Sequence, residues 1–154
     1  MFGSSYKIMT VWGIPIKIHI SLVVLLVFVA FAASQIGGTL EIMEMLLLEV
    51  LIFTSIALHE LGHSFVAIRK GCRVREITLL FIGGAAQMED IPRKPRDEFQ
   101  MAVAGPAVSL LLCIAFWELG GYLPLQLTRY PFPLWPRLLI ICNFIQFIGV
   151  INLS

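Results

Sequence analysis

Charged residues are scarce in this sequence. Asp, Glu, Lys and Arg make up 14% of its 154 residues, while hydrophobic residues make up 58%. Soluble domains carry roughly 25% charged and about 45–50% apolar residues, so the composition excludes an ordinary soluble protein. It predicts an integral membrane protein surrounded by a lipid bilayer. The length corresponds to a single domain over residues 1–154.

Cysteine is also rare. The three cysteines, Cys72, Cys113 and Cys142, are an odd number at no spacing typical of a metal site. Two of them lie in apolar runs, so we interpret all three as small hydrophobic side chains without a disulfide framework. No basic surface is interleaved with aromatic residues, and we therefore expect no nucleic-acid partner.

Four apolar stretches are candidates for membrane spans, which need about 17–25 residues each. They cover residues 20–33, 45–68, 99–117 and 138–153, and we expect the third to be interrupted at Gly105-Pro106. Alternating runs at 7–12 and 14–18 predict two short strands or an extended arm, and residues 74–88 predict a hairpin or edge strand. The expected fold class is an α-helical polytopic membrane protein, with about four transmembrane helices and a small membrane-associated β-hairpin or sheet.

The distribution of charge predicts the orientation. Residues 34–44 form an expected loop with two acids and no Lys or Arg, whereas residues 69–101 are rich in basic residues. Basic loops stay in the cytoplasm, so we expect the N-terminus and the 69–101 loop there. The basic residues of that loop are Arg69, Lys70, Arg73, Arg75, Arg93, Lys94 and Arg96.

The second apolar stretch contains the HExxH motif His59-Glu60-Leu61-Gly62-His63. Two imidazoles four residues apart fall on one face of a helix, so both rings can reach one metal ion. Glu60 is adjacent to His59, where its carboxylate can reach a metal-bound water. His63 lies six residues before Arg69, roughly 9 Å along a helix at ~1.5 Å per residue. The motif therefore predicts a zinc site close to the cytoplasmic face.

The alternative is that the two histidines only form hydrogen bonds between helices. Ionisable groups at membrane depth are costly and usually have a function or a partner, and three of them within five residues favour the metal site. Zinc needs at least one more protein ligand besides the two imidazoles. Gly62, between the histidines, would let another helix or strand approach closely.

Several other motifs accompany HExxH. Gly13-Ile14-Pro15-Ile16 with His19 and Ser21 precedes the first span, Ile82-Gly83-Gly84 is followed by Ala85 and Met88, and Ala104-Gly105-Pro106 is followed by Ser109. Together these motifs resemble those of the site-2 protease family of intramembrane zinc metalloproteases, over nearly the whole sequence. The second of these motifs resembles the family's membrane-dipping β-hairpin, and the third resembles the family's Gly-Pro helix signature. Many members have Asn where this sequence has Ser109.

The resemblance implies an enzyme that cleaves transmembrane segments of single-pass regulatory proteins, using metal-activated water. His59 and His63 would bind Zn²⁺, and Glu60 would be the general base. The residues we expect to contact the substrate are Gly83, Gly84, Ala85, Ser109 and Asn152. An exposed edge around residues 80–87 would capture the unwound substrate by β-strand addition.

One part of the family pattern is missing. The family's third zinc ligand is an aspartate in an Asn-x-x-Pro-x-x-Pro-x-Asp-Gly motif, whereas this sequence has Asn152-Leu153-Ser154 at its end. Glu49 is no substitute, because it lies ten residues before His59, roughly 15 Å along the helix at ~1.5 Å per residue. We therefore expect a fragment of a longer enzyme. Two other functions stay open: a catalytically silent membrane protein that binds helices, and a carrier of metal ions or protons.

Overall fold

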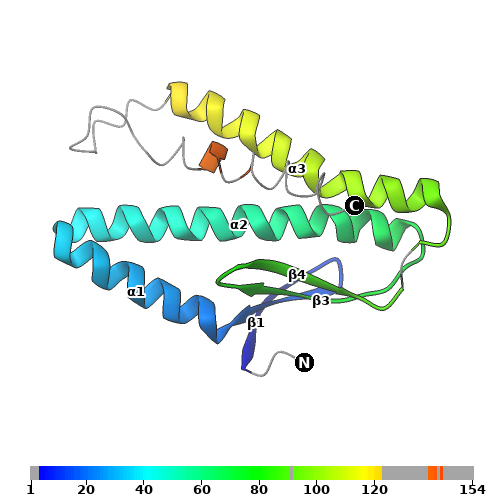
Figure 1. The fold of residues 1–154 in the computed structure, drawn as a ribbon, viewed down its shortest axis with the longest axis horizontal. Coiled ribbons are helices and arrows are strands. Elements are labelled where there is room, and N and C mark those ends of the chain that lie inside the picture. The colour runs from blue at the N-terminus through cyan, green and yellow to red at the C-terminus, as the bar shows by residue number, and fades with distance from the viewer. Residues whose placement is uncertain (1–3, 91, 123–138, 142, 144–154) are drawn as a thin grey trace.

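The computed structural model describes residues 4–90, 92–122, 139–141 and 143. Its long helix α2 lies in the middle, with α3 along one side and both α1 and the β-sheet along the other (Figure 1). The elements in chain order are β1 (Ser5–Val11), β2 (Ile14–His19), α1 (Ile20–Ile36), α2 (Thr39–Arg69), β3 (Val74–Leu80), β4 (Gly83–Met88) and α3 (Pro95–Tyr122).

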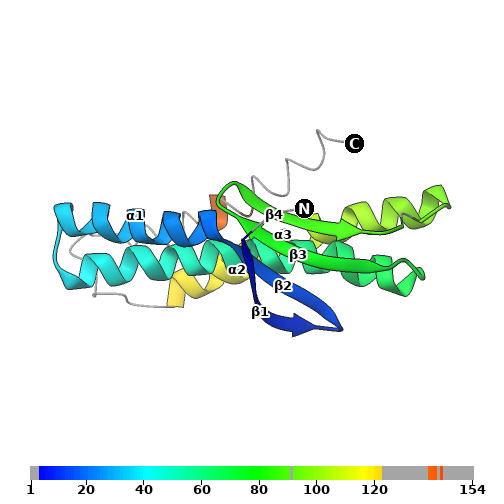
Figure 2. The same ribbon diagram turned by 90° about the horizontal axis from the view of Figure 1, so that it is seen from below.

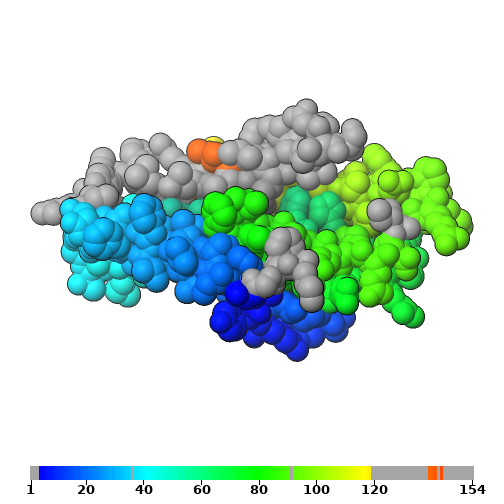
Figure 3. Space-filling view, turned by 60° about the horizontal axis from the view of Figure 1, so that its bottom comes forward, coloured from blue at the N-terminus to red at the C-terminus, as the bar shows by residue number. Residues whose placement is uncertain are grey.

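The strands form one four-stranded sheet in the order β1-β2-β3-β4. The two short strands expected near the N-terminus are confirmed as the antiparallel hairpin β1–β2, and the hairpin expected over residues 74–88 is confirmed as β3–β4. The parallel pairing of β2 with β3, through Ile16 opposite Ile77 and Ile18 opposite Leu79, joins the hairpins and is not predicted from the sequence. The first hairpin projects from the body of the molecule (Figures 2 and 3).

The turn of the first hairpin packs against the C-terminal end of α2. Trp12 and Gly13 both have positive φ, 49° and 80°, as a two-residue hairpin turn of type I′ requires. The Trp12 and Phe65 rings pack with a centroid distance of 4.9 Å, and the Arg69 guanidinium lies 4.4 Å from the centroid of the Phe65 ring. These contacts hold the sheet beside the half of α2 that carries the HExxH motif.

The hydrophobic core lies between the sheet and α2. It is a cluster of buried aliphatic and aromatic side chains from β2, β3, α1 and α2, namely Ile14, Ile16, Leu22, Phe53, Leu61, Ile77 and Leu79. Many large apolar side chains of the helices point outward instead, among them Val27, Phe28, Leu47, Leu111 and Trp117. Contiguous exposed apolar surface of this kind suits a bilayer better than water.

Among the described residues, two helices are long and apolar enough to cross a membrane: α2 and the Pro95–Glu118 part of α3. Helix α1 is apolar but shorter, and the expected span over residues 138–153 lies almost entirely outside the described residues. The helices and the small mixed sheet agree with the expected fold class. The number of four spans stays a prediction.

Two details of the expected organisation are wrong. Residues 34–44 are not a loop, since α1 continues to Ile36 and α2 already begins at Thr39. Glu41 belongs to the first turn of α2, where its carboxylate accepts a hydrogen bond of 2.8 Å from the Gly38 amide. The third apolar stretch is not interrupted at Gly105-Pro106 either, because α3 continues through Pro106 as one helix.

Candidate metal centre

Helix α2 presents the HExxH motif to its two neighbours. Successive residues of a helix are rotated by about 100°, so His59 and His63 share one face and Glu60 points to another. The histidines face α3, and Glu60 faces strand β4. His59 is buried, with 6% of its surface exposed, and His63 is half-buried.

The two imidazoles converge through one nitrogen each. His59 Nε2 and His63 Nε2 are 3.1 Å apart, and the ring planes are nearly perpendicular at 75°. The predicted approach of the two side chains is therefore present, on one face and within reach of a common ion.

The outer ring nitrogens are held by α3. His63 Nδ1 lies 2.8 Å from the Met101 carbonyl oxygen. A carbonyl only accepts hydrogen bonds, so Nδ1 of His63 carries the proton and its Nε2 keeps a lone pair. His59 Nδ1 lies 2.7 Å from Ser109 Oγ, and a hydroxyl can donate or accept. Ser109 Oγ can therefore accept a hydrogen bond from a protonated His59 Nδ1, and in that tautomer Nε2 keeps a lone pair that can bind a metal.

The residues fit zinc in distance and in chemistry. Two nitrogens bound to one tetrahedral zinc at 2.0–2.1 Å lie about 3.3 Å apart, close to the 3.1 Å between the two Nε2 atoms. Zinc-binding histidines donate their other ring N–H to an oxygen, as Met101 and Ser109 allow here. In the described part of the chain, no group of three or more His, Cys, Asp or Glu is placed to hold a metal. The described centre is therefore a two-nitrogen site.

Close contact between α2 and α3 positions these partners. A Cβ added to Gly62 would lie 3.0 Å from the Ala104 carbonyl oxygen and 2.9 Å from Val108 Cγ2. A Cβ added to Gly105 would overlap the His63 imidazole. The expectation that Gly62 admits a neighbouring helix is confirmed, and Gly105 has the matching role on α3.

Glu60 lies between the histidines and the sheet. Its carboxyl group is in hydrogen-bond contact with the backbone amide of Ala86 in β4. A Cβ added to Gly84 would be 3.0 Å from Glu60 Cγ and 2.9 Å from Ile56 Cγ2. Gly84 therefore lets β4 pack closely on α2 beside the Glu60 side chain.

The other residues expected to contact substrate lie in different places. Gly83 has a positive φ of 141° and open space where a Cβ would be, and Ala85 follows it in the same strand. Ser109 is buried, and its hydroxyl oxygen lies 2.7 Å from His59 Nδ1. Asn152 lies outside the described residues.

Two contributors are not found from the sequence. Met101 acts through a backbone carbonyl, which leaves no side-chain signal. Gly105 reads as a helix interruption, although its spacing of four residues before Ser109 places both on the face toward α2. That spacing is the one signal that would have identified Gly105.

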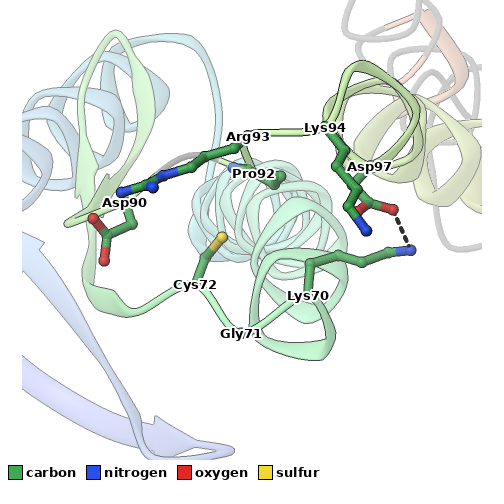
Figure 4. Close-up of a pocket in the computed structure, with 8 residues that line it drawn as sticks. All are labelled: Lys70, Gly71, Cys72, Asp90, Pro92, Arg93, Lys94 and Asp97. Carbon is green, nitrogen blue, oxygen red and sulfur yellow. Dashed lines mark hydrogen bonds and ion pairs between the residues drawn. The ribbon is translucent and has the colours of Figure 1, made fainter.

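A polar pocket of about 400 Å³ lies beyond the motif, where α2 ends and α3 begins (Figure 4). Lys70 and Asp97 form an ion pair of 2.7 Å across it and join the two helices. Arg93 and Lys94 also line it, on the segment that leads into α3. This pocket contains none of the residues expected in the metal centre.

A helix-borne HExxH motif with converging ring nitrogens, inside an apolar helical protein, defines a zinc-metallopeptidase type of site. The comparison with known families agrees with this class. The chain belongs to peptidase family M50, the site-2 protease family, whose model matches residues 46–153. Its resemblance to that family is thereby confirmed, and the family is one of membrane-embedded zinc metalloproteases.

Relatives and a solved structure support the assignment. A zinc metalloprotease of Methanocaldococcus jannaschii is 36% identical over 127 residues, covering 82% of this chain and 36% of that protein. A putative zinc metalloprotease of Synechocystis is 35% identical over 131 residues, covering 80% of this chain and 34% of that protein. The solved site-2 protease from M. jannaschii superposes with a TM-score of 0.71 and 31% identity, covering 94% of this chain and 63% of that one. This chain thus spans about a third of the length of the curated relatives it matches.

Proposed function

We propose that this chain is the zinc-binding core of an intramembrane endopeptidase that cleaves transmembrane segments of single-pass regulatory proteins. The observation that carries the proposal is the convergence of His59 Nε2 and His63 Nε2 at 3.1 Å, with each Nδ1 held by α3. Membership of peptidase family M50 supports it.

His59 and His63 would hold a Zn²⁺ ion through their Nε2 atoms, with a third ligand from outside the described residues. A bound zinc ion supplies Lewis-acid chemistry, since it makes water acidic near neutral pH and polarises a peptide carbonyl. Ser109 and Met101 keep the two rings in the required tautomer and orientation.

Glu60 acts as the proton carrier. Its carboxylate oxygen takes a proton from the attacking water as the new C–O bond forms. The same oxygen then gives the proton to the amide nitrogen as the C–N bond breaks, so the carboxylate is regenerated. The contact of Glu60 with the Ala86 amide supports this role, because it fixes the carboxyl group next to the strand expected to bind substrate.

Strand β4 is the proposed substrate platform. A transmembrane helix keeps its carbonyl groups hydrogen-bonded, so it must unwind before the peptide bond can be attacked. β4 is the last strand of the described sheet, and its outer edge has no strand partner there. An unwound substrate segment would add to that edge through its backbone, with Gly83 and Ala85 leaving room.

The proposed orientation has the metal centre near the cytoplasmic face. Seven basic residues lie within residues 69–96, from the last residue of α2 onward, including Lys70, Arg93 and Lys94 around the polar pocket. Clusters of this kind favour the cytoplasmic side. The N-terminal hairpin would lie on the same side.

The decisive experiment compares two Glu→Gln variants of the full-length protein that contains this chain. Glu60→Gln should abolish cleavage of a membrane-embedded test substrate and leave the zinc content unchanged. Glu44→Gln, the same change on the same helix but far from the motif, should retain both. A His59→Ala, His63→Ala double variant should lose the zinc. Cleavage by Glu60→Gln at the normal rate would overturn the proposal.

A second candidate function rests on the two-nitrogen site. Because the described residues supply no third His, Cys, Asp or Glu ligand, a catalytically silent protein that binds transmembrane helices also fits. Such a protein would hold zinc at well below one ion per chain. It would still bind the substrate segment, and Glu60→Gln would leave that binding unaffected.

A further inference from the structure

A cavity of about 220 Å³ lies under the projecting β1–β2 hairpin, away from the metal centre. Residues from β1, β2, β3, α1 and α2 line it, including Met9, Ile18, Leu26, Phe53 and Leu79. The lining is apolar except for Glu49 and Thr54. Met9 and Val50, two of the exposed residues in the lining, are apolar, so part of the surface that a ligand from the bilayer would meet is hydrocarbon.

One ionisable group faces this apolar space. Glu49 lines the cavity and is 7% exposed, and both of its carboxyl oxygens are buried without a hydrogen-bond partner. A buried polar group without a partner costs free energy, and an ionisable residue at membrane depth usually marks a site of function. The proposed proteolysis does not use Glu49, which lies ten residues before His59 on α2.

The cavity limits the size of a ligand. Its volume exceeds the ~150 Å³ of an engineered apolar cavity that binds benzene, so it can hold a small molecule. An α-helix is about 10–12 Å wide with its side chains, too wide to enter this space. A single alkyl chain of moderate length fits both limits.

The carboxyl group limits the chemistry of the ligand. An ionised carboxylate only accepts hydrogen bonds, whereas a protonated carboxyl also donates one. A hydroxyl group donates and accepts, so it satisfies Glu49 in either state. The hydroxyl of Thr54, which also lines the cavity, donates to the Val50 carbonyl at 2.7 Å and is not available as that donor.

We propose that this cavity binds a single-chain aliphatic alcohol, whose hydroxyl pairs with Glu49 and whose chain lies among the apolar side chains. The site is separate from the metal centre and does not depend on the proposed function. It gives the protein a means of sensing a small amphiphile in the bilayer.

The experiment measures binding of two probes, 1-octanol and n-octane, to the purified chain in micelles at equal mole fraction in the detergent. Ligand-observed NMR reports saturable binding. Wild-type protein should prefer octanol over octane by about tenfold or more, because the hydroxyl satisfies an otherwise unpaired group. Glu49→Leu should remove the preference, whereas Glu49→Gln should keep it, since an amide also donates and accepts.

Two further variants test whether the cavity itself is the site. Ala57→Phe places a ring in the cavity and should weaken the binding of both probes. Glu44→Leu, on the same helix but outside the lining, should bind both probes as wild type does. Equal binding of octanol and octane by wild type, a preference that survives Glu49→Leu, or binding unchanged by Ala57→Phe would each overturn the proposal.

Discussion

Replacing Gly105 by alanine is the sharpest test of the metal centre. The added Cβ would lie 2.6 Å from both Cδ2 and Cε1 of His63. Carbon atoms in contact are normally about 3.5–4.0 Å apart, so the ring must move by roughly 1 Å or the two helices must separate. Either movement separates His63 from the Met101 carbonyl and from His59 Nε2.

The expected effects can be estimated separately. Loss of ring orientation should lower zinc affinity by about 10–100-fold, as for other losses of hydrogen-bonded support around a metal. A displacement of ~1 Å at a catalytic group can lower the rate by about 10²-fold. For stability, overpacking costs about 1–3 kcal/mol and the better helix propensity of alanine returns about 0.8–1.0 kcal/mol. The net destabilisation should therefore lie between about 0 and 2 kcal/mol, too small to unfold the protein.

The assay is competition with a zinc chelator on purified protein, together with cleavage of a membrane-embedded substrate by the full-length protein. Ala107→Val is the matched control, because it adds carbon atoms to an exposed position two residues further along α3. It should leave the zinc affinity unchanged. If Gly105→Ala binds zinc as tightly as wild type and cleaves at the same rate, the contact between α3 and His63 does not position the metal ligand.

Three other substitutions test separate parts of the structure. Ser109→Ala should lower zinc affinity by about 10–100-fold, measured by chelator competition, since His59 Nδ1 loses its 2.7 Å contact. Ser64→Ala removes an equally buried hydroxyl that has no partner, and unchanged affinity in both variants would contradict the role of Ser109. Ala85→Pro should impair cleavage and leave the zinc content unchanged, because proline removes a backbone hydrogen-bond donor from β4. Ala85→Ser is the control, since it keeps that donor. Equal cleavage by the two variants would count against substrate binding at this strand. Glu76→Gln should lower the free energy of unfolding by about 0.2–1 kcal/mol, measured by thermal unfolding at low salt, because it breaks the ion pair with Lys17 between β2 and β3. If the same loss of stability persists at high salt, the ion pair is not its cause.

The sequence predicts the parts of this protein that depend on neighbouring residues. The spacing of His59 and His63 places both rings on one helix face, alternation predicts the strands of the first hairpin, and residues 74–88 predict the second hairpin. Composition alone does not predict where the helices begin and end. Glu41 reads as part of a polar loop, yet it starts α2 by accepting a hydrogen bond from Gly38.

The parts that depend on packing between distant segments are not predicted. The parallel pairing of β2 with β3 joins strands separated by two helices, and no local pattern specifies it. The partners of the histidines come from residues 38 and 50 positions away. Such contacts depend on how closely α3 approaches α2, which is decided by Gly62 and Gly105 together.

The two glycines also explain why the metal centre needs both helices. Side chains at these positions would hold the helices apart, and His63 would then lose the Met101 carbonyl that fixes its tautomer. HExxH supplies two rings on one helix, but a free imidazole can carry its proton on either nitrogen. The fixed arrangement of Nε2 toward Nε2 arises only when α3 takes up the outer nitrogens. In the proposed metal site the motif would provide two ligands, and the glycine contact between the helices would position them.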